Sequence, residues 1–302
     1  MEFTAVALII VSAFTHAGWN LMGKHEHPSI AFFLVATVIG TLALSPVVLP
    51  VVPTVLRFPP AVWLPLTVGG LFQCLYYTSL SAAYRCGELS VVYPIARAFP
   101  LVFVAAGSFL LGRGDAISTT CLAGGALIMA GCFVLPQASF KDIRPGGYLN
   151  RASATALVVA LCTVVYSLAD DHCIRLLSPL TSQGISSFRL SLLYLLVQNL
   201  TSIGFMLLLV LPRATARGRL RHTVTRRLKN AAVTGIGVSG TYSLVLTAMN
   251  FASDVTYVVA FRQLSIPLGA LMGMGILKES RTAPKFTGIA IMSVGLVLVA
   301  AG

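Results

Sequence analysis

The sequence predicts an all-α membrane protein with ten transmembrane helices, arranged as two inverted repeats of five helices. Of the 302 residues, 57% are hydrophobic and only 10% are charged, whereas soluble domains are roughly 25% charged. The mean hydropathy is +0.88, and apolar runs close to the roughly 20 residues that a spanning helix needs recur along the chain. No polar segment is long enough to form a separate soluble domain, so the whole chain is expected in the membrane.

Ten apolar segments are separated by short stretches rich in charge, Pro and Gly. The predicted spans are 3–22, 30–52, 61–83, 90–111, 117–136, 153–174, 185–211, 231–250, 255–276 and 285–301. We therefore expect a first repeat over 1–136, a connecting loop over 137–152 and a second repeat over 153–302. The run 3–22 lacks a basic leader and a clear cleavage site, which favours a retained first helix.

The two halves resemble each other at an offset of about 164–165 residues. Arg97 corresponds to Arg262 at an offset of 165, and Gly124 and Gly131 correspond to Gly288 and Gly295 at 164. Because each half has an odd number of spans, the second half must be inverted relative to the first. The paired glycines predict close helix packing of the fifth and tenth spans.

Loop charge predicts the orientation. The loops on the side of the termini carry three basic residues in total, Arg57, Arg113 and Arg175. The loops on the opposite side carry fourteen Lys or Arg residues, seven of them in 212–230. By the positive-inside rule, both termini are expected outside and the basic loops in the cytoplasm.

The composition also excludes several function classes. We attribute the net charge of +12 to basic loops that set the orientation in the membrane and contact lipid headgroups. Nucleic-acid binding is not expected, because no basic run is interleaved with aromatic residues that could stack on bases. The six cysteines are scattered without a C-x-x-C pair, and neither a Walker A loop nor a metalloprotease or hydrolase motif is present. We expect no catalysis, no cofactor and no metal.

The two arginines are the first candidates for a binding site, because a charged side chain inside a spanning helix costs roughly 2.5–3.5 kcal/mol and needs a function or a partner. Arg97 and Arg262 would approach the midplane from opposite faces, and two guanidinium groups would suit a phosphonate, phosphate or carboxylate. They could instead extend to the interface or pair with a carboxylate. Tyr93 and Tyr257 precede them by about one turn, as ligand donors or as interfacial aromatics.

Further polar side chains lie in apolar segments. Candidate cavity residues are His16, Trp19, Asn20, Gln73, Tyr77 and Gln263. Asp170 and Asp171 are expected to balance an arginine or to carry a proton, and His16 is the other candidate to carry the proton. Pro94, Pro100 and Pro267 could kink the arginine-bearing helices and free backbone carbonyls.

These features resemble the EamA-type drug/metabolite transporter superfamily, over essentially the whole chain. The marks are HAGWNLMGK at 16–24, YPIAR at 93–97, YVVAFRQ at 257–263 and LKE at 277–279; the first half has Gly114 and Asp115 where the family commonly keeps Glu. The resemblance implies a bundle around a cavity made by spans one, three, four, six, eight and nine, with spans five and ten outside. It also implies cytoplasmic termini in many members, against the charge count here, and some relatives with W-N-x-x-x-K are associated with phosphonate-utilisation genes.

The predicted function is alternating-access transport of a small anionic or zwitterionic metabolite, such as a phosphonate, carboxylate or amino acid. An exporter of amino acids or hydrophobic drugs is the alternative, and a membrane-embedded enzyme or a channel is less favoured. The expected partners are the small solute and membrane lipid, with a homodimer left open, and the expected location is the bacterial inner membrane. The sequence leaves the substrate, the direction and the coupling ion open.

Overall fold

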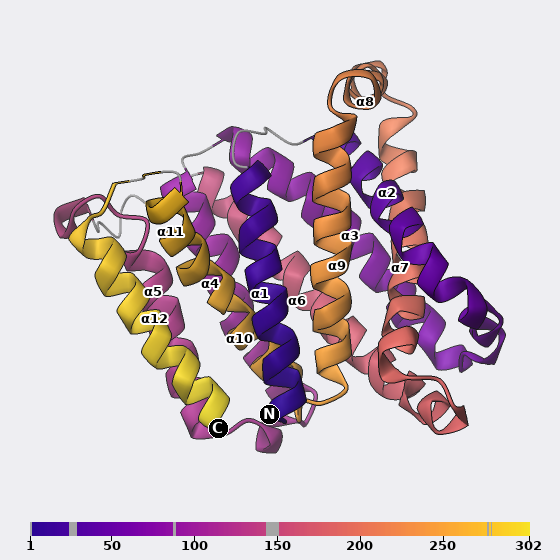
Figure 1. Cartoon of the computed structure of the whole chain (residues 1–302), viewed down its shortest axis with the longest axis horizontal. Coiled ribbons are helices and arrows are strands. Elements are labelled where there is room, and N and C mark those ends of the chain that lie inside the picture. The colour runs from indigo at the N-terminus through magenta and orange to yellow at the C-terminus, as the bar shows by residue number, and fades with distance from the viewer. Residues whose placement is uncertain (1, 24–28, 87–88, 143–150, 277, 279) are drawn as a thin grey trace.

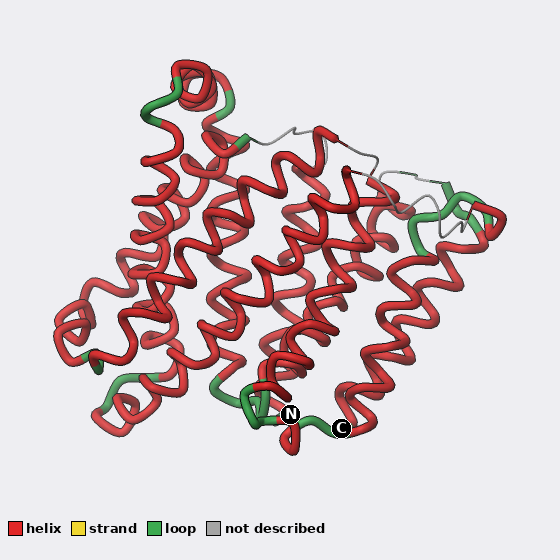
Figure 2. Tube along the Cα trace, turned by 180° about the vertical axis from the view of Figure 1, so that it is seen from behind, coloured by secondary structure: helices red, strands yellow, loops and turns green. Residues whose placement is uncertain are grey.

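The structure is a computed structural model that describes residues 2–23, 29–86, 89–142, 151–276, 278 and 280–302. These residues form α-helices and short 3-10 turns, without a strand among them (Figure 2). The α-helices are α1 (Phe3–Gly23), α2 (Ile30–Val48), α3 (Pro60–Cys86), α4 (Leu89–Leu110), α5 (Thr119–Val134), α6 (Arg151–Leu177), α7 (Ser187–Val210), α8 (Ala214–Arg226), α9 (Leu228–Met249), α10 (Val255–Phe261), α11 (Ser265–Ile276) and α12 (Ala283–Ala301). The 3-10 turns are η1 (Leu49–Arg57), η2 (Gly114–Ala116), η3 (Phe140–Asp142), η5 (Ser178–Gln183) and η6 (Arg262–Leu264).

The protein is an all-α integral membrane protein. Within the described residues, six helical segments are long and apolar enough to cross a membrane: 30–57, 153–183, 187–210, 228–249, 255–276 and 283–301. Shorter apolar helical segments cover 3–18, 95–110 and 119–134. Large apolar side chains such as Phe3, Leu56 and Leu110 are at least 85% exposed, which suits contact with lipid tails and not with water.

The predicted spans coincide with helices, with two differences. The segment 212–230, predicted as a polar loop, contains α8, because Ala and Leu are good helix formers and so is Arg in spite of its charge. The predicted span 255–276 is interrupted by η6, between α10 and α11. Pro267 has no N–H to donate to the carbonyl of Gln263, so the regular hydrogen-bond ladder cannot continue there. In contrast, α4 continues through Pro94 and Pro100 without a break.

The helices lie side by side in one tilted bundle, with both termini at one end and α8 at the other (Figure 1). Extensive contacts join α3 to α6, α1 to α9, α4 to α6 and α1 to α11. Two further contacts join α2 to α9 and α3 to α7. The pair α5 and α12 lies at one edge of the bundle and packs along its length (Figure 1).

Glycine allows α5 and α12 to approach each other closely. A Cβ atom on Gly124 would lie 2.5 Å from the carbonyl oxygen of Gly295, and one on Gly131 would lie 2.8 Å from that of Gly288. Either distance is too short for a side chain to fit without a shift of the backbone. The predicted close packing of these two helices is therefore confirmed.

Candidate functional site

Both arginines line one small cavity, here called the arginine cavity. Its walls come from α1, α4, α9, η6 and α11, and from no residue of α5 or α12. The lining residues are Ser12, Ala13, His16, Arg97, Thr241, Tyr242, Val245, Arg262 and Ser265. The volume open to the centres of water molecules is about 20 Å³, enough for one or two waters, so this conformation encloses the site tightly.

Arg97 contacts His16 across the cavity. The Nη2 atom of Arg97 lies 2.6 Å from Nε2 of His16, which joins the middle of α4 to α1. Because a guanidinium group can only donate, Nε2 must accept, and His16 is then the neutral tautomer with its proton on Nδ1. The contact holds one edge of the guanidinium group beside the cavity.

Arg262 is held differently, by an aromatic ring. Its Cζ atom lies 5.3 Å from the centroid of the Tyr242 ring, within the range of a cation–π contact. Among the described residues, no carboxylate forms an ion pair with Arg262. The side chain sits at the helix interruption, about 10 Å from the start of α10 at 1.5 Å per residue.

Tyr242 also reaches a buried carboxylate. Its hydroxyl donates to Oδ2 of Asp170, while Tyr194 donates to Oδ1 over 2.6 Å and Gln198 donates to the same oxygen through Nε2. These four residues, the Asp170 cluster, join α6, α7 and α9, and Asp170 is wholly buried. The aromatic row continues from Tyr242 to Tyr166 and Tyr76, with ring centroids 6.0 and 5.8 Å apart.

The neighbouring carboxylate, Asp171, belongs to a separate ionic cluster near the chain termini. Asp171 pairs with Arg113 at 2.5 Å and with Arg175 at 3.0 Å, and Arg113 also lies 3.1 Å from Asp254. Arg175 donates to the backbone carbonyls of Ala252 and Ser253 as well. Asp171 therefore balances these two arginines and not Arg97 or Arg262.

Gln73 and Tyr77 line a second, smaller cavity between α2, α3, α7 and α9. Tyr77 stacks on Phe33 with ring centroids 4.5 Å apart, and Tyr242 contributes to the walls of both cavities. The two predicted residues are thus near the arginine cavity but are not part of its lining.

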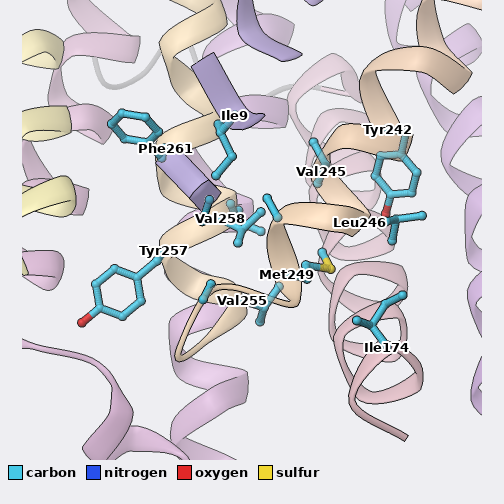
Figure 3. Packing of buried hydrophobic residues seen from close by; sticks show 14 of the residues in the cluster. Ile9, Ile174, Tyr242, Val245, Leu246, Met249, Val255, Tyr257, Val258 and Phe261 are labelled. Carbon is cyan, nitrogen blue, oxygen red and sulfur yellow. The ribbon is translucent and has the colours of Figure 1, made fainter. Parts of the chain in front are cut away.

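Two predicted residues point elsewhere. The hydroxyl of Tyr257 accepts from the backbone N–H of Ser118 and donates to the carbonyl of Gly302, and the side chain points away from Tyr242 (Figure 3). Tyr257 precedes Arg262 by five residues, a rotation of about 140° on a helix of 3.6 residues per turn, which separates their faces. Gln263 is buried and donates to the carbonyl of Val259. The expectation that either residue lies beside the guanidinium groups does not hold in this conformation.

Some predicted features fall outside the description. The side chains of Trp19, Asn20 and Tyr93 are not among those that the structure describes, and neither are Lys24, Leu277 and Glu279. The described residues contain no group of three His, Cys, Asp or Glu that could hold a metal ion.

The contribution of α7 was not predicted from the sequence. Ser191, Tyr194, Gln198 and Ser202 recur at spacings of three and four within an apolar helix, and all are buried. That spacing marks one polar face directed into the bundle, and it could have indicated that α7 supplies donors to Asp170. Tyr242 is a polar candidate in the sequence, but nothing in the sequence indicated that it contacts both Arg262 and Asp170 and lines both cavities.

Comparison with known proteins supports the fold alone. No family model matches the chain, and no curated protein matches it. Among solved structures, one described only as a protein is similar over 100% of this chain and 99% of its own length, with a TM-score of 0.70 and 16% sequence identity. At that identity the likeness extends to the path of the backbone and carries no function.

Proposed function

We propose that the protein is a secondary transporter of a small organic anion, working by alternating access. In this proposal the ten segments predicted from the sequence cross the membrane as two inverted halves of the EamA type. The halves move against each other around a fixed site, so that a solute meets each side of the membrane in turn. No covalent chemistry is needed, and the solute is a phosphonate or a carboxylate.

One observation carries the anion-binding part. Arg97 from the first half and Arg262 from the second line the same cavity, and each is more than one turn from the end of its helical segment. The described carboxylates nearby have other partners. Arg113 pairs with Asp171 and Asp254, and Asp170 accepts from neutral donors. The charge of Arg262 is therefore available to a bound oxyanion, which a planar guanidinium can bind through two hydrogen bonds.

The packing pattern supports the inverted repeat. In the repeat, Gly124 corresponds to Gly288 and Gly131 corresponds to Gly295. In the structure, Gly124 approaches Gly295 and Gly131 approaches Gly288, so the contacts are exchanged between the two pairs. Exchanged contacts of this kind are those that a two-fold axis generates. The contact of α1 with α9 likewise has its counterpart in that of α6 with α3.

The orientation in the proposal follows loop charge. The basic helix α8 lies at the end of the bundle opposite the termini (Figure 1). With α8 in the cytoplasm of a bacterial cell, its arginines would face anionic headgroups, and the ionic cluster would lie at the outer end.

The test is uptake of radiolabelled methylphosphonate and lactate by vesicles containing the purified protein. Arg97→Ala and Arg262→Ala should each abolish saturable uptake, whereas Arg189→Ala should not, because Arg189 is an exposed arginine in α7 outside both cavities. Uptake that survives both cavity substitutions in a folded protein would contradict the anion site.

An exporter of amino acids is a second candidate, favoured by the row of Tyr76, Tyr166 and Tyr242. Aromatic faces bind ammonium groups, so a zwitterion could place its carboxylate on Arg262 and its ammonium on the tyrosines. Competition decides between the two: an amino acid that displaces methylphosphonate better than lactate does would favour this candidate.

A further inference from the structure

Asp170 is a carboxylate enclosed by neutral donors. It is wholly buried, and it accepts hydrogen bonds from Tyr194, Gln198 and Tyr242. On the side of α3, a Cβ atom on Gly69 would meet Oδ1 of Asp170 at 3.3 Å, so backbone closes that side. Among the described residues, no Lys, Arg or His forms an ion pair with this carboxylate.

The surrounding groups can serve both protonation states of the carboxyl group. Gln198 donates through Nε2, while its Oε1 atom is buried and has no partner among the described groups. Rotation of this amide by half a turn would present Oε1 as an acceptor for a proton on Asp170. A metal cation would instead need oxygen lone pairs directed at it, whereas the two tyrosine hydroxyls donate towards the carboxylate.

Arg262 provides a positive charge near this carboxylate. The titratable and charged groups near it are Tyr166 and Cys173 on α6, Tyr194 on α7, Tyr242 on α9 and Arg262 on η6. Only Arg262 among them is charged at neutral pH, and Tyr242 lies between it and Asp170. In the low dielectric of a buried site, the positive field of Arg262 stabilises the ionised carboxylate.

We propose that Asp170 is the proton-binding site of proton–anion symport, and that an anion on Arg262 and a proton on Asp170 favour each other's binding. A bound anion cancels the field of Arg262, so the charge on Asp170 loses its stabilisation and the carboxylate oxygen takes a proton from water. When the anion leaves on the other side, the field returns and the proton is released there. No bond in the solute changes, and the proposal rests on the anion transport proposed above.

The test is a proton count on binding. Methylphosphonate is titrated calorimetrically into the purified full-length protein at pH 7, in two buffers with different heats of ionisation. Wild type should take up about one proton more per bound anion than Asp170→Asn, as linkage requires. The titration of the ligand itself is common to both proteins, so the difference reports the protein. Equal proton uptake by the two would overturn the proposal.

Asp171→Asn is the matched control, since it removes the adjacent buried carboxylate while Arg113 keeps Asp254 as a partner. Its proton count should equal that of wild type, and a count equal to that of Asp170→Asn would overturn the assignment to Asp170. If Asp170→Asn does not fold, wild-type vesicles still decide. An inward proton gradient should drive methylphosphonate accumulation that a protonophore abolishes, and accumulation insensitive to the protonophore would contradict symport.

The two proposals fail in different ways. Binding of methylphosphonate by wild type without proton uptake overturns symport and leaves the anion site standing. If wild type neither binds nor takes up methylphosphonate or lactate, the anion-transporter proposal is overturned, and proton coupling with it.

Discussion

The Nη2 atom of Arg113 lies 3.1 Å from Oδ2 of Asp254, an ion pair without hydrogen-bond geometry that joins the turn after α4 to the N-cap of α10. Asp254 is wholly buried, and it also accepts from Ser108 and caps α10 through the N–H of Thr256. The ionic cluster therefore ties together helices from the two halves of the chain, at the end where both termini lie.

Asp254→Asn tests this tie. The amide can still cap α10, so the substitution removes the charge and little else. We expect the free energy of unfolding to fall by about 1–3 kcal/mol, less than the 3–5 kcal/mol for an isolated buried partner, because Arg113 keeps Asp171. Thermal unfolding in detergent measures the change. Asp115→Asn, at an exposed acid nearby, should leave the transition where it is.

Two hydroxyl deletions separate the arginine cavity from the Asp170 cluster. Tyr194→Phe and Tyr242→Phe each remove one donor to Asp170, and each should lower stability by about 1.5–3 kcal/mol, the usual range for a bond to a charged group. Only Tyr242 lines the arginine cavity and contacts Arg262, so Tyr242→Phe should change the affinity for methylphosphonate in calorimetry more than Tyr194→Phe, which acts through the proton on Asp170 alone. Equal effects of both on affinity would show that Tyr242 has no special link to the anion.

Arg262→Lys tests geometry against charge. Lysine keeps the positive charge but loses the planar fork that binds an oxyanion through two bonds. Loss of one charge-assisted bond of about 1.5–3 kcal/mol corresponds to at least about tenfold weaker binding. Methylphosphonate uptake by vesicles at low concentration measures this, with Arg189→Lys as control. Uptake equal to wild type would mean that only the charge matters.

The glycine contact predicts a steric penalty. In Gly295→Ala the new Cβ would lie 2.6 Å from the carbonyl oxygen of Gly124, so α5 and α12 must separate, at a cost of about 1–3 kcal/mol. Gly275→Ala is the control, because nothing lies within 4 Å of a Cβ there. Thermal unfolding of the two variants should differ in this order, and equal transitions would contradict the close approach.

A reporter fused to either terminus tests the orientation. The excess of basic residues on the opposite side predicts that both reporters read as external. A cytoplasmic signal from both would reverse the orientation and place the ionic cluster at the inner end of the bundle.

The sequence predicted the positions of the helices well, because membrane insertion leaves a direct trace as runs of apolar residues. It also predicted the close approach of α5 and α12, because only glycine fits there. It could not predict that Arg97 pairs with His16 or that Asp171 turns to Arg113, since those contacts join residues 58 or more positions apart. Pro267 indicated a possible kink near Arg262, where the helix is interrupted. The helix in 212–230 was not predicted, because its many charged residues are typical of a loop.

The interruption at η6 distinguishes the two arginines. Arg97 is carried by an unbroken rod, whereas Arg262 sits on a joint between two half-helices. We expect the rod to keep its guanidinium in a constant place and the joint to let the other swing as the halves tilt. A solute bound by both arginines would then keep its contact with Arg97 in place while Arg262 moves with it. The two equivalent residues would therefore play different parts in transport.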